Sequence, residues 1–102
     1  MRRYEILLPL LFNDGTPVTE YLSVGVVEAL RGRFGAVSFE TNVIRGHWVH
    51  KGEFYRDDLV RLFVDVPDLP EHRAWFVEFK ERLKRDFKQL DIWISTFPVD
   101  IL

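Results

Sequence analysis

The chain has 102 residues, enough for one domain with a single core and too few for two. Fourteen Lys and Arg against sixteen Asp and Glu give a net charge of −2, which excludes a general attraction to nucleic acid or anionic membranes. The chain has no cysteine, which excludes disulfides, thiolate catalysis and cysteine-bound metals, while aromatic residues reach 15% and call for a structural or functional use.

The first predicted element is a strand over residues 4–11. Its continuous apolar run is typical of a central strand, although Pro9 requires a bulge or an end to the pairing near Leu8. Glu5 interrupts the stretch after Met1 and no small-residue cleavage site follows, so we interpret it as a buried strand and not as a signal peptide. No segment approaches the roughly 20 apolar residues of a membrane helix, so we expect a cytoplasmic protein without membrane contact.

A helix is predicted next, after a turn at residues 13–15. Thr16 is expected to be the N-cap, with Pro17 in the first helical turn. Gly32 or Gly35 supplies the left-handed stop. The apolar side of this helix consists of Leu22, Val26, Ala29 and Leu30, which recur at helical spacing.

The third element is a long β-hairpin over residues 36–66 that turns at Lys51 and Gly52. A two-residue loop pairs His50 with Glu53, so the numbers of paired residues add up to 103. On one face this register gives a nearly apolar ladder that we expect to face the core. Its pairs are Val37 with Val66, Phe39 with Val64, Thr41 with Leu62, and Val43 with Val60.

The outer half of the hairpin is polar and aromatic, which predicts that its tip lies outside the globule. Arg45 opposes Asp58, and Trp48 opposes Tyr55 on the other face. Candidate proton-handling residues here are His47, His50 and Tyr55. The residues expected to contact a ligand or partner are Arg45, Trp48, Glu53, Tyr55, Arg56, Asp57 and Asp58. His47 and His50 are three apart on a strand and point to opposite faces, so we expect no metal site, and no cofactor motif occurs.

A second helix and a last strand complete the chain. Asp68 and Glu71 resemble a capping box around Pro70, and the helix is predicted to run to about Lys88. Residues 91–97 alternate as a strand that ends before Pro98. The apolar stripe of the helix consists of Phe76, Phe79, Leu83, Phe87 and Leu90.

The element order predicts a single α+β domain over residues 1–102. Strand, helix, hairpin, helix and strand form the ferredoxin-like βαββαβ arrangement, an antiparallel sheet with two helices on one face and a long central β-hairpin. The opposite sheet face is then uncovered and strongly apolar, more so than a monomer normally exposes. It should carry Leu7, Leu11, Ile44, Leu59, Phe63, Trp93 and Phe97.

This order and face pattern resemble the dimeric α+β-barrel superfamily, in which two ferredoxin-like subunits pack sheet against sheet. The resemblance implies a homodimer, but no family motif is matched and no catalytic residue is carried over. A monomer whose hairpin curls over its own sheet is the alternative. The dimer-face candidates are Leu7, Ile44, Leu59, Phe63, Trp93 and Phe97.

Two classes of function follow from the sequence. The first is a small, soluble, homo-oligomeric binding or interaction module, since no nucleophile, metal set or phosphate loop occurs. The second, which the resemblance implies, is a cofactor-independent enzyme, monooxygenase- or isomerase-like, that acts on an apolar or aromatic small molecule. RNA binding is disfavoured, because residues 58–66 lack the glycine-rich, basic signature of RNA-recognition domains.

Overall fold

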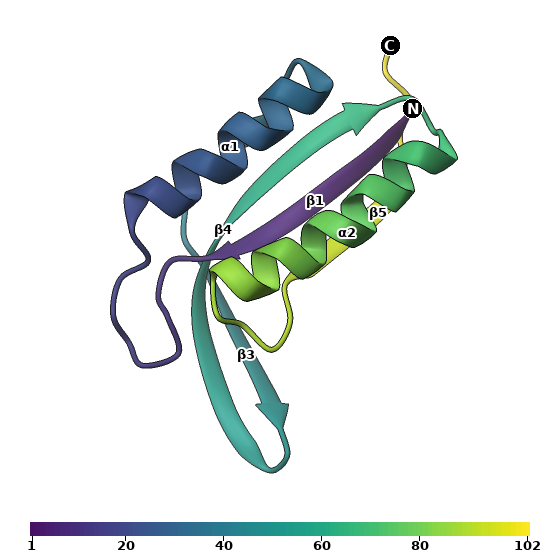
Figure 1. Ribbon diagram of the computed structural model, residues 1–102. Helices are drawn as coiled ribbons and strands as arrows, with labels where there is room; N and C mark the ends of the chain where they lie inside the picture. Colours follow the sequence, from purple (N-terminus) through teal and green to yellow (C-terminus); the bar gives the residue numbers. More distant parts are fainter.

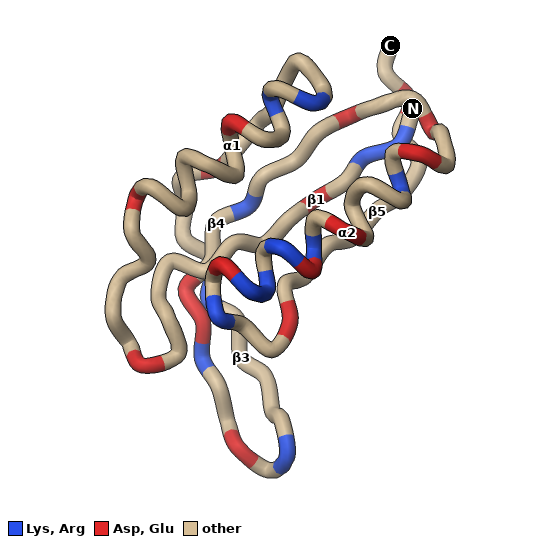
Figure 2. Tube along the Cα trace, viewed as in Figure 1, with Lys and Arg blue, Asp and Glu red and all other residues tan.

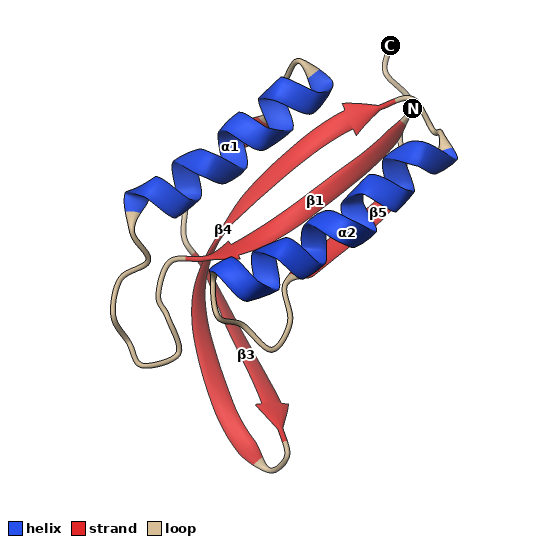
Figure 3. Ribbon diagram, viewed as in Figure 1, coloured by secondary structure: helices blue, strands red, loops and turns tan.

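The computed structural model describes residues 1–102 and has the predicted βαββαβ order, with the first hairpin strand divided in two (Figure 1). The sheet order is β2-β4-β1-β5, all antiparallel, and β3 pairs with the outer part of β4. Both helices lie on one face of this sheet (Figure 3). The elements are β1 (Arg2–Pro9), α1 (Glu20–Phe34), β2 (Ser38–Phe39), β3 (Ile44–His50), β4 (Glu53–Val66), α2 (Pro70–Asp86) and β5 (Trp93–Pro98).

One hydrophobic core fills the space between the helices and the sheet. Alternate residues of β1 and β4 enter it because successive strand residues point to opposite faces. The predicted apolar sides of both helices face it, except for Leu90, which is 53% exposed. The core consists of Tyr4, Ile6, Leu8, Val26, Leu30, Leu62, Val64, Val66, Phe76, Phe79, Leu83, Phe87 and Ile92.

Helix α1 begins later than predicted. The Asp14 carboxylate accepts hydrogen bonds from the backbone N–H and the hydroxyl of Thr16, at 2.9 and 2.6 Å. Pro17 then forms a β-bridge with Leu11, which keeps this segment extended until Glu20. The predicted stop at Gly35 is confirmed, since Gly35 has a left-handed φ of 81° and its N–H donates to the carbonyl of Arg31.

The capping box predicted for the second helix is wrong. The N-cap of α2 is Leu69, which makes no side-chain hydrogen bond to the helix, although Pro70 does occupy the first turn as expected. Asp68 instead accepts a hydrogen bond from Arg2 at 3.1 Å. A long-range ion pair to the neighbouring strand therefore holds the carboxylate that was expected to cap the helix.

The predicted register is confirmed in the outer half of the hairpin and wrong in the inner half. Pairing from Ile44 with Leu59 to His50 with Glu53 keeps the sum of 103, and positive φ at Lys51 (49°) and Gly52 (79°) indicates a type I′ turn. Phe39 pairs with Leu62, which gives a sum of 101. Residues 40–43 connect β2 to β3 and belong to no strand, and the register changes by two residues within this segment.

The inner ladder is therefore not a core ladder. Strand β2 has only two residues at the sheet edge, where Phe39 is 57% exposed, and Val43 is 52% exposed beyond it. Thr41 is exposed as well, and only Val37 packs against the core. The partners expected for these residues lie on β4, and all fully buried residues of this hairpin, Leu62, Val64 and Val66, belong to that strand.

The outer hairpin projects beyond the sheet, and the two chain ends meet at the opposite end of the molecule (Figure 1). The longest dimension is 41 Å, against 28 and 25 Å for the others. The backbone N–H of Val99 donates to the carbonyl of Met1 at 3.1 Å, which joins the terminal segments. Neither helix has the length and apolar character needed to cross a membrane.

Candidate functional site

The sheet face without helices carries ion pairs at its centre, so the prediction of a mainly apolar face is wrong there. Arg3 on β1 donates two hydrogen bonds to Asp65 on β4, at 2.8 and 3.0 Å. The same hydrogen bonds hold the pKa of Asp65 below its usual value and raise that of Arg3. Arg61 binds both Glu5, at 3.2 Å, and Glu40. The signal was present in the sequence, because Arg3 and Glu5 alternate with the buried Tyr4 and Ile6.

The six dimer-face candidates do share this face. Strand pairing places Leu7 beside Trp93, Leu59 beside Ile44, Phe63 beside Glu5 and Phe97 beside Arg3. Trp93 is 66% exposed and Phe97 39%, while the other four are partly covered by their neighbours. The guanidinium of Arg3 lies 4.4 Å from the centre of the Phe63 ring. Aromatic side chains and ion pairs are thus interleaved, and the role of this face in assembly stays a prediction.

A groove of about 520 Å³ lies at the base of the projecting hairpin. We call it the hairpin groove. Its lining residues come from β1, β3 and β4 and from the segment between α2 and the start of β5. Figure 1 shows that this segment runs near the base of the hairpin. It is lined by Leu7, Pro9, Gly46, His47, Trp48, His50, Asp57, Leu59, Gln89, Leu90, Asp91, Ile92 and Trp93.

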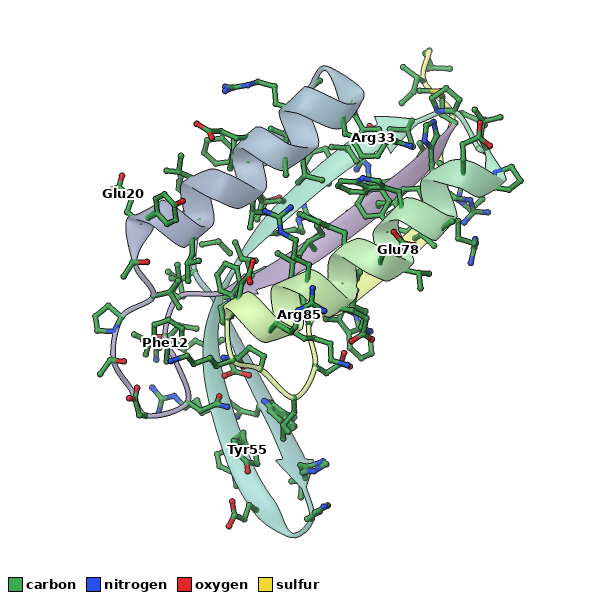
Figure 4. The ribbon with its side chains drawn as sticks, in the orientation of Figure 1. Phe12, Glu20, Arg33, Tyr55, Glu78 and Arg85 are labelled. Atoms are coloured by element: carbon green, nitrogen blue, oxygen red, sulfur yellow. The ribbon has the colours of Figure 1, made fainter.

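Trp48 is held firmly in this groove. Its indole N–H donates to Oδ2 of Asp57 at 2.6 Å, across the β3–β4 pair. Its ring stacks on Tyr55, with the ring centres 4.4 Å apart and the planes 17° apart. Tyr55, labelled on the hairpin in Figure 4, donates its hydroxyl to Glu53 at 3.0 Å, and this bond raises the pKa of the phenol above its ordinary value. Tyr55 therefore supports Trp48 and stays protonated at neutral pH.

The two candidate histidines are separated by the strand that carries them. His50 lies on the same face as Trp48, with the ring centres 6.2 Å apart. The ring of His47 packs edge-on against Phe54, at 5.3 Å, on the other face. No three His, Asp or Glu side chains converge in a way that could hold a metal ion.

The structure gathers only some of the predicted contact residues. Trp48, His50 and Asp57 border the groove, whereas Arg45 and Asp58 face each other 3.9 Å apart on the other side of the hairpin. Arg56, on that same side, and Glu53, beside the turn, are exposed. Figure 2 shows these charges distributed along the hairpin.

Sequence reasoning missed the second wall of the groove. Gln89, Leu90 and Asp91 follow α2 and lie against the hairpin base, although the chain separates them from it by some thirty positions. Leu90 continues the helical stripe in the sequence, but the helix ends at Asp86. Because of this early end, Leu90 lines the groove and not the core. No local signal in residues 87–91 could have identified the hairpin as their neighbour.

Comparison with known proteins shows a shared fold. No protein-family model and no curated protein matches the sequence. A phage SAM lyase in complex with S-methyl-5'-thioadenosine superposes with a TM-score of 0.69 and 22% identity, covering 94% of this chain and 79% of the lyase. The divalent cation tolerance protein CutA1 of Thermus thermophilus gives 0.62 and 19%, over 97% and 84% of the two chains. A CutA1 variant from Pyrococcus horikoshii gives 0.62 and 17%, over 100% and 86%.

Proposed function

We propose that this protein is a homo-oligomer that binds a small planar organic molecule in the hairpin groove. The observation that carries the proposal is the composition of the groove. Trp48 and Trp93 border it together with Leu7, Leu59 and several polar side chains. Binding sites for small molecules are typically apolar and aromatic concavities with a few placed polar groups, and a volume near 500 Å³ suits a ligand of this kind.

A fold neighbour supports the chemical class of the ligand. The phage SAM lyase holds S-methyl-5'-thioadenosine, whose purine is a flat aromatic ring system. Such a ring stacks on indole, and aromatic stacking of this kind contributes about 1–3 kcal/mol per base. Trp93 offers a suitable surface, because 66% of it is exposed on β5 beside the groove.

Binding is tested with S-methyl-5'-thioadenosine as the probe. We expect its titration to shift the NMR signals of the Trp48 and Trp93 indole N–H groups more than that of Trp75, which packs among the helix aromatics. Trp93→Ala should weaken binding about fivefold or more, as expected for the loss of one stacking contact. Tyr21→Ala is the matched control, since Tyr21 is 85% exposed on α1 and outside the groove. Equal binding by both variants would place the probe elsewhere.

The second part of the proposal is assembly through the open sheet face and the projecting hairpin. On the open sheet face, Trp93 and Phe97 of β5 are exposed, and on the hairpin Val49 (66%) and Phe54 (64%) are exposed. Exposed apolar side chains of this number are typical of a surface that another protein subunit covers. Size exclusion coupled to light scattering should report a multiple of 12.1 kDa. A species of that single mass at micromolar concentration would contradict the assembly.

The second candidate function is catalysis in the same groove. It is favoured by the position of His50 and Asp57, two residue types used in proton transfer, beside Trp48. The fold shared with the phage SAM lyase supports catalysis by analogy alone, because one fold can carry many different activities. Mass spectrometry should then detect conversion of a bound probe, lost in His50→Gln and kept in His72→Gln, because His72 packs against Phe34 outside the groove. Binding of the probe without its conversion would contradict catalysis and support binding as the function of the groove.

A further inference from the structure

We infer that the hairpin groove selects a positively charged ligand, an aromatic or compact organic cation, over an anionic one of the same shape. The inference rests on the proposed function and adds the charge of the ligand. Its starting point is the set of ionisable side chains at the groove. The ionisable lining residues are Asp57, Asp91, His47 and His50, and no lysine or arginine is among them, although the chain has fourteen of these.

Asp57 is the carboxylate that carries the argument. One of its oxygens accepts the indole N–H of Trp48 at 2.6 Å, which fixes the carboxylate at the groove wall. Its second oxygen makes no hydrogen bond to the protein, and no lysine or arginine lies within ion-pair distance. The side chain is also partly buried, so water screens its charge less than at an open surface. A ligand cation could therefore supply the missing counter-charge.

Asp91 contributes less, because it is already compensated. One of its oxygens lies 3.0 Å from the ammonium of Lys80, and the same oxygen accepts the backbone N–H of Ile92 at 2.9 Å. Lys80 stands outside the groove lining. Asp57 is therefore the lining carboxylate without a counter-charge.

The aromatic walls add to this preference. An organic cation is attracted to the face of an indole ring by about 0.5–2 kcal/mol, depending on how far it is desolvated. Trp48 and Trp93 both border the groove, and Trp48 is held in place by Asp57 and Tyr55. An anionic ligand, such as a phosphate ester, would meet the same rings and the Asp57 carboxylate with unfavourable electrostatics, and the lining has no lysine or arginine to bind it.

Three indole probes of similar shape separate the contributions: tryptamine is cationic, 3-methylindole neutral and indole-3-acetate anionic at neutral pH. Isothermal titration should give about tenfold tighter binding of tryptamine than of indole-3-acetate, the ratio expected for one partly screened charge. Asp57→Asn should reduce the ratio to about threefold or less, since the amide oxygen still accepts from Trp48 but the charge is gone.

Asp58→Asn is the matched control, because it removes a carboxylate from the neighbouring position on the other face of the hairpin. It should leave the ratio unchanged. Equal or tighter binding of the anion, or a ratio that survives Asp57→Asn, overturns the inference while leaving the binding function standing. If none of the three probes binds at millimolar concentration, the proposed function fails and the inference falls with it.

Discussion

Removing the hydroxyl of Tyr4 should stabilise the protein. Tyr4 lies in the middle of β1 and is only 2% exposed, and its ring stacks on Phe76 with centres 4.1 Å apart and planes 8° apart. The hydroxyl oxygen is buried and has no hydrogen-bond partner. In the unfolded chain the same hydroxyl is fully hydrated, so folding loses its hydrogen bonds to water without replacement.

The size of the effect follows from this loss. Mutational data place the cost of an unpaired buried polar group at about 1–3 kcal/mol. Replacing tyrosine by phenylalanine keeps the stack on Phe76 and gives up only the few dispersion contacts of one oxygen atom, each worth about 0.1–0.2 kcal/mol. The net expectation for Tyr4→Phe is a gain of about 1 kcal/mol in the free energy of unfolding.

The assay is urea unfolding together with calorimetry, at one fixed protein concentration because oligomers melt in a concentration-dependent way. For a domain of this size, a gain of about 1 kcal/mol raises Tm by roughly 4–8 °C. Tyr21→Phe is the control, since Tyr21 is 85% exposed and should change stability by less than about 0.5 kcal/mol. A loss of stability in Tyr4→Phe would refute the reasoning and show that the hydroxyl is paired in solution.

Three further predictions concern other elements. The Arg3 guanidinium lowers the pKa of Asp65, so this pair stabilises the fold at neutral pH and the contribution is lost as the pH falls through the lowered pKa. The difference in stability between the parent and Asp65→Asn should therefore shrink between about pH 7 and pH 3 in thermal melts. Lys51→Asn should slow amide exchange in the hairpin by stabilising its type I′ turn by several tenths of a kcal/mol, and no change in exchange would argue against that turn. Gly35→Ala should cost about 1 kcal/mol in urea unfolding because its φ of 81° is left-handed, and an unchanged midpoint would contradict the cap.

Predictions from the sequence were most accurate for the features of the fold that local chemistry and periodicity determine. Gly52 in a two-residue turn determined the register of the outer hairpin, and helical spacing identified the buried sides of both helices. The inner register was missed for a physical reason. A shift of two residues leaves every side chain on the same face, so the alternation that exposes a one-residue slip gives no sign of it.

Long-range contacts account for the other errors. Asp68 accepts a hydrogen bond from Arg2 and does not cap α2. Arg61 on β4 forms ion pairs with Glu5 on β1 and with Glu40, directly after β2. The alternation in β1 identifies Glu5 as a polar residue of the open face, but no local pattern identifies the partner of Glu5 or of Asp68. The groove is a similar case: Trp48 and Asp57 could be placed side by side from the register, but the wall from α2 to β5 depends on where the chain returns in space.

The break at residues 40–43 has a consequence for the groove. Strand β4 is the only element that runs unbroken from the sheet into the hairpin, because β2 and β3 are separate strands along its edge (Figure 1). The groove residues on β3 and on the outer part of β4 are therefore joined to the sheet by one continuous strand, and bending of β4 would move them relative to the segment that follows α2. Changes at residues 40–43, none of which lines the groove, would thus offer a route for altering the size of ligand it accepts while keeping every contacting side chain.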